Sequence, residues 1–193
     1  MLAKGLVKIA TVSALALTLE ANAAHRDLWV FGDSLTSPAN SWAEVIDDQG
    51  YAQIRNTARA GLRLVDVTMP NWLYCWQGEE VVLRLGTNDA GNNVPAAVYE
   101  QKLIDVLQFL QGRDCKVWLM LPIRFTGGGQ ELDQRLRKFK QITRRTGRNY
   151  QNVTILDVPY NEKETGDGLH PTAEAQEIAA AWIIEALKLK REI

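Results

Sequence analysis

The regular alternation of two kinds of segment constrains the fold of this 193-residue sequence more than any other feature. Short apolar segments rich in β-branched residues recur, and most lack the alternation of polar and apolar positions found in a sheet with one face in water. They lie at residues 28–31, 54–57, 81–85, 117–121 and 153–158. We interpret them as strands that are covered on both faces.

Stretches with helical spacing of apolar residues lie between and after these strands, at residues 42–48, 65–72, 95–111, 131–149 and 173–190. Strands that alternate with helices are joined by right-handed crossovers and form a parallel sheet. The sequence therefore predicts an α/β fold, in which a five-stranded parallel sheet forms the middle of a three-layer α/β/α domain. Pro95 suits the first position of its helix, and Gly112 suits its end.

The first 23 residues have the three-part layout of a secretory signal peptide. Lys4 and Lys8 precede an apolar stretch at residues 9–19, and small residues follow up to Ala23, after which we expect cleavage. The apolar stretch is shorter than the ~20 residues that cross a bilayer, so no membrane span is expected. We expect residues 24–193 to form one domain, a monomer exported to the periplasm or the exterior of a bacterial cell.

Charge and cysteine content limit the partners and the compartment. A formal net charge of −1 argues against nucleic acid as a partner. Cys75 and Cys115 are the only cysteines, and this even number permits one disulfide in an oxidising compartment. Two unpaired buried thiols are the alternative. Each cysteine precedes a predicted strand, so both lie on the same edge if the third and fourth strands are neighbours, as in a flavodoxin-type order.

Four polar segments follow predicted strands or precede the last helix, at residues 31–36, 56–61, 86–89 and 167–171. Ligands of open α/β sheets bind beyond the carboxyl ends of the strands, so these segments are expected to meet at one edge. His170 lies in the last segment and is one of only two histidines. The other histidine adjoins the expected new N-terminus and makes a poor base.

The residue types in these segments suit acyl transfer. A serine hydroxyl needs a base to take its proton, so Ser34 is the candidate nucleophile and His170 its base. Asp167 precedes His170 by three residues, and a tight turn places its carboxylate against the imidazole. The backbone N–H groups of Ser34 and Gly61, with the Asn88 side-chain amide, supply donors for an oxyanion.

The same segments resemble the conserved blocks of the GDSL, or SGNH, hydrolase family. The matching residues are Gly-Asp-Ser-Leu at 32–35, Gly61, Gly-Thr-Asn-Asp at 86–89 and Asp-Gly-Leu-His-Pro at 167–171. The four blocks arrive in order across nearly the whole expected mature chain. The serine segment lacks the second glycine of the G-x-S-x-G elbow, which argues against an α/β-hydrolase fold.

The resemblance implies a flavodoxin-like SGNH hydrolase fold with Ser34, Asp167 and His170 as a triad. It implies an oxyanion hole from Ser34, Gly61 and Asn88, and an esterase that requires no cofactor and no metal. The substrate is then a small-molecule, lipid or acylated-carbohydrate ester.

The segment Leu-Pro-Ile-Arg at 121–124 is similar to the periplasmic thioesterase and lysophospholipase branch of the family. This branch would act on short-to-medium acyl esters, lysophospholipids or acyl thioesters. A carbohydrate O-acetylesterase, and an acyltransferase that uses the same residues, remain open.

Two alternative hypotheses assign the chain to other functional classes, a metal-dependent hydrolase and a non-catalytic binding module. Asp33, Asp89, Asp167 and His170 could ligate a hard metal ion in a phosphohydrolase-like site. A non-catalytic carbohydrate- or lipid-binding module is the other. We expect Asp33 and Asp89 to have a structural role instead, by bonding backbone amides of loops.

Three other features have open interpretations. The basic residues of the 131–149 helix form either a solvated face or a surface for anionic lipid or polysaccharide. Glycines at 127–129 form either a flexible loop that covers the site or a surface loop without a role in the site. The aromatic residues Trp72, Tyr74 and Trp76 either fill a corner of the core or stack on sugar or lipid.

Overall fold

The structure is a computed structural model that describes residues 26–37, 41–123, 127, 129–160, 165, 167–189 and 191. Residues 1–23, the expected signal peptide, lie outside the described residues, so cleavage after Ala23 stays a prediction. Within the described ranges, no helix combines the length and apolarity needed to cross a bilayer.

In chain order the elements are β1 (Asp27–Gly32), α1 (Trp42–Asp48), β2 (Gln53–Asn56), the 3-10 turn η1 (Leu64–Asp66), β3 (Glu80–Arg84), α2 (Thr87–Gly91), α3 (Ala96–Gln111), β4 (Lys116–Met120), α4 (Gly129–Gly147), β5 (Val153–Leu156) and α5 (Ala173–Leu187).

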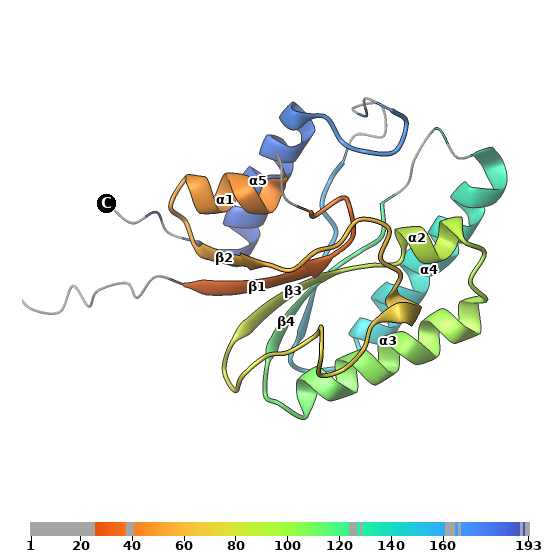
Figure 1. Ribbon diagram of the computed structural model, residues 1–193, viewed down its shortest axis with the longest axis horizontal. Helices are drawn as coiled ribbons and strands as arrows, with labels where there is room; N and C mark the ends of the chain where they lie inside the picture. The colour runs from red at the N-terminus through yellow and green to blue at the C-terminus, as the bar shows by residue number, and fades with distance from the viewer. Residues whose placement is uncertain are drawn as a thin grey trace, which may run out of the picture.

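The five strands form one parallel sheet in the order β2-β1-β3-β4-β5. Helices α1 and α5 cover one face, and α2, α3 and α4 cover the other (Figure 1). The predicted α/β fold with a five-stranded parallel sheet between layers of helices is therefore confirmed. The strand order is of the flavodoxin type, so β3 and β4 are neighbours.

Burial on both faces explains why the strands lack a polar alternation. In β1, Leu28 and Val30 pack into the apolar cluster under α1 and α5, whereas Trp29 and Phe31 pack into the cluster under α3 and α4. Both sets are buried, so each successive position of the strand needs an apolar side chain. Strand β2 lies at an edge and alternates exposed with half-buried residues.

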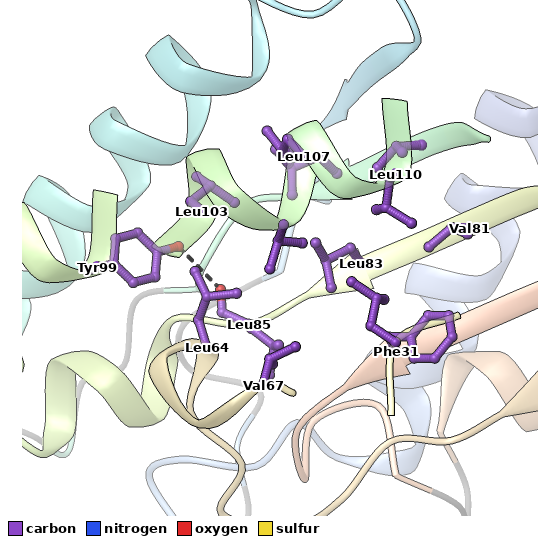
Figure 2. Packing of buried hydrophobic residues seen from close by; sticks show 14 of the residues in the cluster. Phe31, Leu64, Val67, Val81, Leu83, Leu85, Tyr99, Leu103, Leu107 and Leu110 are labelled. Carbon is purple, nitrogen blue, oxygen red and sulfur yellow. Dashed lines mark hydrogen bonds between the residues drawn. The ribbon is translucent and has the colours of Figure 1, made fainter. Parts of the chain in front are cut away.

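Helix α3 illustrates how the helices attach to the sheet (Figure 2). Its buried side chains recur with helical spacing at Tyr99, Leu103, Leu107 and Leu110 and face residues of the central strands. The Tyr99 hydroxyl donates to the Leu85 carbonyl at 3.4 Å, just beyond β3. Pro95 is the N-cap residue and the helix begins at Ala96, one position later than predicted.

The prediction of a helix at residues 65–72 is wrong. Only Leu64–Asp66 forms a 3-10 turn, and an irregular segment follows it. Pro70 lies inside the predicted stretch, lacks an N–H to donate and disfavours the helical conformation of the preceding residue. The sequence also missed α2, a helix of five residues that is too short to produce a periodic pattern.

Other boundaries shift by a few residues. Helix α4 begins at Gly129 and ends at Gly147, two residues earlier at each end than predicted. Helix α5 ends at Leu187, where Lys188 adopts a left-handed conformation with φ 53° and stops the helix before the predicted end at residue 190.

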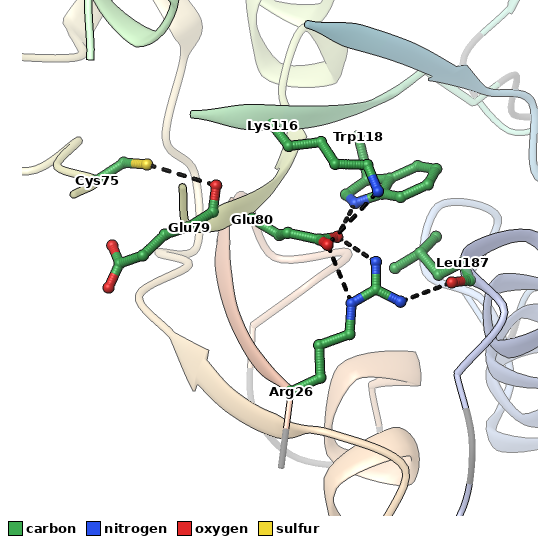
Figure 3. Close-up of polar contacts among 7 residues, drawn as sticks. All are labelled: Arg26, Cys75, Glu79, Glu80, Lys116, Trp118 and Leu187. Carbon is green, nitrogen blue, oxygen red and sulfur yellow. Dashed lines mark hydrogen bonds and ion pairs between the residues drawn. The ribbon is translucent and has the colours of Figure 1, made fainter. Parts of the chain in front are cut away.

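The amino edge of the sheet is held by a disulfide. A polar cluster around Glu80 holds the same edge (Figure 3). Cys75 and Cys115 are bonded, with Cα atoms 6.4 Å apart, and precede the neighbouring strands β3 and β4. Beside this bond, Glu80 accepts hydrogen bonds from Arg26 and Trp118. These contacts join β1, β3 and β4 at the edge opposite the expected site.

The basic side chains of α4 are mostly paired with carboxylates. The pairs are Arg137 with Asp133 at 2.8 Å, Lys140 and Arg144 with Asp157 at 2.6 and 2.5 Å, and Arg145 with Glu100 at 2.6 Å. The pairing reduces the positive potential of this face, which favours the solvated-face interpretation over an anionic surface.

The three aromatic residues before β3 have different surroundings. Trp72 packs edge to face on Phe31 at 5.1 Å between ring centroids, and Tyr74 packs on Trp29 at 4.6 Å. These two fill the core on the α3 side of the sheet. Trp76 is 69% exposed.

Candidate active site

The turn that carries Ser34 follows β1 directly. The backbone N–H groups of Thr36 and Ser37 donate to the Asp33 carbonyl at 3.0 and 2.9 Å. A Cβ at Gly32 would lie 2.7 Å from the Cβ of Thr36, so a larger residue does not fit where the strand ends. The turn leaves Ser34 half-buried beyond the carboxyl end of β1.

Asp167 and His170 form a local pair before α5. Asp167 Oδ2 lies 2.7 Å from His170 Nδ1, and Asp167 Oδ1 accepts the backbone N–H groups of Leu169 and His170 at 2.9 and 2.6 Å. The hydrogen bond with the His170 ring, followed by the two backbone bonds, holds the pKa of Asp167 well below its usual range. The carboxylate is therefore ionised and favours the imidazole tautomer with the proton on Nδ1.

The imidazole also reaches the serine. His170 Nε2 lies 3.0 Å from Ser34 Oγ, although the two residues are 136 positions apart in sequence. With the proton on Nδ1, Nε2 accepts the hydrogen bond that the Ser34 hydroxyl donates. The structure thus brings together all three residues predicted as a triad, within the range that proton transfer requires.

Gly61 and Asn88 lie on loops at the same edge. The loop after β2 is bonded to β1, because the Arg59 N–H donates to the Gly32 carbonyl at 3.0 Å. Gly61 in this loop is exposed and has a φ of 75°. Asn88 Nδ2 donates to the carbonyl of Leu62 at 3.1 Å, which fixes the amide beside the glycine loop. An amide nitrogen has two hydrogens, so this bond occupies one of them.

A glycine is required where the chain leaves β3 for α2. Gly86 has a φ of 120°, and a Cβ there would lie 2.7 Å from the Tyr99 hydroxyl oxygen and 3.0 Å from Cγ of Pro122. The close approach lets α2 begin immediately after the strand. As a result, Asn88 in the first turn of α2 lies at the carboxyl edge of the sheet.

Asp33 and Asp89 bond backbone amides, as expected from the sequence. Asp89 accepts the N–H groups of Leu64 and Val65 at 2.7 and 3.1 Å, and Asp33 Oδ1 accepts that of Leu35 at 3.0 Å. Burial raises the pKa of both carboxyl groups. No cluster of three or more potential metal ligands occurs among the residues that the structure describes. The two carboxylates therefore have structural partners in the loops.

The loop after β4 contacts the turn between Asp167 and His170. A Cβ at Gly127 would lie 3.0 Å from the carbonyl oxygen of Gly168. A hollow of about 240 Å³ lies at the carboxyl ends of β4 and β5, and none of Ser34, Asp167 and His170 lines it. It is lined by Leu121, Pro122, Ile123, Lys140, Asp157, Val158, Pro159 and Tyr160.

Sequence reasoning missed one charged residue beneath the site. Arg84, the last residue of β3, is only 1% exposed, and its Nη1 donates to the Leu35 carbonyl at 2.8 Å. Its guanidinium lies over the ring of Tyr160, 5.1 Å from the ring centroid. The signal in the sequence is a lone arginine within the otherwise apolar segment 81–85.

Solved structures with a similar fold come from esterases and acylhydrolases. An acetyl xylan esterase, AlAXEase, superposes with a TM-score of 0.73 at 19% identity over 83% of this chain and 99% of that chain. A lipase/acylhydrolase from Enterococcus faecalis superposes with a TM-score of 0.70 at 21% identity, over 87% of this chain and 99% of that chain. A catalytic mutant of an acetylxylan esterase from Geobacillus stearothermophilus superposes with a TM-score of 0.70 at 13% identity, over 86% of this chain and 95% of that chain. At these identities the similarity concerns the fold.

No curated protein matches the chain. A family model does match it, however, over residues 30–178, which include Ser34, Gly61, Asn88, Asp167 and His170. The chain therefore belongs to the GDSL-like lipase/acylhydrolase family, a family of carboxylic ester hydrolases.

Proposed function

We propose that the chain hydrolyses carboxylic esters through an acyl-enzyme on Ser34. The observation that carries the proposal is the continuous chain of contacts from Asp167 through His170 to Ser34, at 2.7 and 3.0 Å. The Ser34 hydroxyl gives its proton to His170 Nε2 while Oγ forms a bond to the ester carbonyl carbon. Asp167 stabilises the resulting imidazolium.

The same groups complete acylation and then carry out deacylation. His170 returns the proton to the leaving alcohol as the carbonyl–oxygen bond breaks and the acyl group remains on Ser34. A water molecule then loses a proton to His170 and attacks the acyl carbon. When this second tetrahedral intermediate collapses, the bond between Ser34 Oγ and the acyl carbon breaks, His170 returns the proton to Oγ, and the acid is released. We assign the oxyanion of both tetrahedral intermediates to the N–H groups of Ser34 and Gly61 and to the Asn88 amide.

We infer that short-to-medium acyl esters, lysophospholipids or acyl thioesters are the substrates. Acetyl groups on a carbohydrate are a second candidate, because two of the structures with this fold are acetyl xylan esterases. The Leu-Pro-Ile-Arg segment at 121–124, which is similar to the thioesterase and lysophospholipase branch of the family, supports the first candidate.

A panel of p-nitrophenyl esters from acetyl to palmitoyl, with an acyl-CoA and acetylated xylan, tests both candidates. Ser34→Ala should abolish turnover and labelling by a fluorophosphonate while the fold is kept. Ser37→Ala, in the same turn, is the matched control and should retain both. Normal turnover by Ser34→Ala would falsify the mechanism, and activity restricted to acetyl substrates would favour the carbohydrate deacetylase.

We also propose that residues 1–23 direct export. The basic residues followed by an apolar stretch support this, and the disulfide is consistent with an oxidising compartment. Expression of the full chain in a bacterium, followed by intact mass measurement of the periplasmic protein, tests it. A periplasmic species that begins at Ala24 is expected, whereas an uncleaved chain in the cytosol contradicts the proposal.

A further inference from the structure

Arg84 is a charged residue in a position that core packing does not explain. It ends the central strand β3, and its neighbours Val82 and Leu83 are fully apolar and buried. Its Nη1 donates to the Leu35 carbonyl at 2.8 Å, while Nε and Nη2 are buried and have no hydrogen-bond partner among the residues that the structure describes. Burial of a guanidinium with unsatisfied donors costs free energy, so a compensating role is expected.

The turn that carries the nucleophile is held from both sides at Leu35. Its N–H donates to Asp33 Oδ1 at 3.0 Å, and its carbonyl accepts from Arg84. Asp33 and Arg84 are each only 1% exposed. Burial raises the pKa of Asp33, and the positive charge of Arg84 opposes this shift. Two buried polar side chains, a carboxyl group and a guanidinium, therefore fix the residue that follows Ser34.

The same guanidinium lies over a ring of the segment that leads to the base. Its Cζ lies 5.1 Å from the ring centroid of Tyr160, which is in the segment between β5 and Asp167. The Tyr160 hydroxyl lies 3.5 Å from Gln176 Oε1, on the helix that follows His170. Arg84 thus contacts both the nucleophile turn, through an N–H group, and Tyr160 in the segment before the acid–base pair.

We propose that Arg84 is a positioning residue that sets the separation between Ser34 Oγ and His170 Nε2. The inference rests on the proposed function. The nucleophile turn follows β1, whereas the base belongs to the loop between β5 and α5, and two strands, β3 and β4, lie between β1 and β5 in the sheet. Arg84 stands on β3 and contacts both segments, so its loss lets the hydroxyl and the imidazole move apart.

Substitutions at Arg84 test the role through the chemical step. Arg84→Met keeps the length of the side chain but removes the charge and the donors. A small displacement of Ser34 from His170 should lower kcat about 10- to 100-fold. KM should change less than about threefold, because the nucleophile and the oxyanion donor of this turn act mainly on the transition state. Arg84→Lys keeps a charge and a donor for the Leu35 carbonyl, and should recover most of kcat.

Arg26→Met is the matched control at the opposite edge of the sheet. It removes a second partly buried arginine, which bonds Glu80 and the Leu187 carbonyl (Figure 3). Both Met variants should unfold more readily than the wild type, as measured by urea denaturation. Only Arg84→Met should lose kcat per folded molecule and react slowly with a fluorophosphonate. Equal kcat in the two Met variants, or Arg84→Lys as slow as Arg84→Met, overturns the role.

A pair of Tyr160 variants decides the question if Arg84→Met does not fold. Tyr160→Leu removes the ring on which the guanidinium lies and should lower kcat, whereas Tyr160→Phe keeps the ring and should retain it. Equal kcat in the two variants contradicts the positioning role. A wild-type protein that neither cleaves the esters nor takes up the phosphonate contradicts the proposed function itself, which separates the two failures.

Discussion

At the scale of single residues, the site depends on side chains whose partners leave them little freedom. Asp167 uses one oxygen for the His170 ring and the other for two backbone N–H groups. Asn88 is fixed by its bond to the Leu62 carbonyl. Charges and hydrogen-bond donors that are already held in place need little reorganisation when the transition state forms. They therefore stabilise the charge that develops in it.

The oxyanion role of Asn88 leads to a prediction about rate. Asn88→Ala should lower kcat by about 10²–10³, the usual loss when one oxyanion donor is removed. The affinity for substrate should change little, because the donor acts mainly on the charge of the transition state. Steady-state kinetics with a p-nitrophenyl ester measure both. Asn149→Ala, an exposed asparagine before β5, serves as control, and equal kcat in the two variants would remove Asn88 from the site.

At the scale of elements, β3 connects stability with the site. Its first residue, Glu80, anchors the polar cluster at the amino edge, and its last, Arg84, supports the nucleophile turn. The strand between them is buried on both faces and has a neighbour on each side. A charged residue is tolerated only at the two ends, where partners from other elements reach it.

The Glu80 cluster predicts a pH dependence of stability. Burial raises the pKa of Glu80, but hydrogen bonds from Arg26 and Trp118 outweigh it and hold the pKa below the ordinary 4.5. A lowered pKa stabilises the fold above about pH 4.5, and this stabilisation disappears as the pH falls through the folded-state value. Glu80→Gln should therefore cost about 1–3 kcal/mol of unfolding free energy at neutral pH.

Urea denaturation at neutral pH and near pH 3 measures this difference. The gap between the wild type and Glu80→Gln should narrow at the lower pH, because the stabilisation from the ionised carboxylate declines as the pH falls from the ordinary pKa of 4.5 toward the lowered pKa of the folded state. Glu177→Gln, on an exposed position of α5, should show no such gap at either pH. A gap for Glu80→Gln that stays constant with pH contradicts the assignment.

At the scale of the whole molecule, the two edges of the sheet have different tasks. The amino edge carries the disulfide and the Arg26–Glu80 contact, and the carboxyl edge carries Ser34, Asn88 and His170. A parallel sheet places every strand end of one kind on one side, so this separation follows from the topology. Changes at the amino edge should affect stability without altering the chemistry.

The disulfide provides the test. The bond closes a loop of 40 residues, and chain entropy predicts a stabilisation of about 4 kcal/mol. The double variant Cys75→Ser/Cys115→Ser should therefore lose up to about this amount of unfolding free energy, measured in urea. Its kcat should equal that of the wild type under conditions where both are folded. A large loss of kcat in the folded variant would show that the edges are coupled.

Much of the fold could be predicted from the sequence because its signals are local or repeat with a short period. Two-sided burial makes each strand apolar, and this pattern located all five strands within two residues at each end. The expected helix at 65–72 failed, since Pro70 outweighs a weak apolar pattern. Helix α2 was missed because five residues are too few for a period to appear.

The sequence by itself determined the order of the elements, the parallel sheet and the residue types available at its carboxyl edge. Only the tertiary structure decided that Ser34 and His170 meet across 136 residues, and that Arg84 lies beneath them. It likewise showed that most of the α4 cations are paired with carboxylates. The physical reason is that such contacts depend on how loops from separate strands pack, and periodicity along the chain carries no information about distances between them.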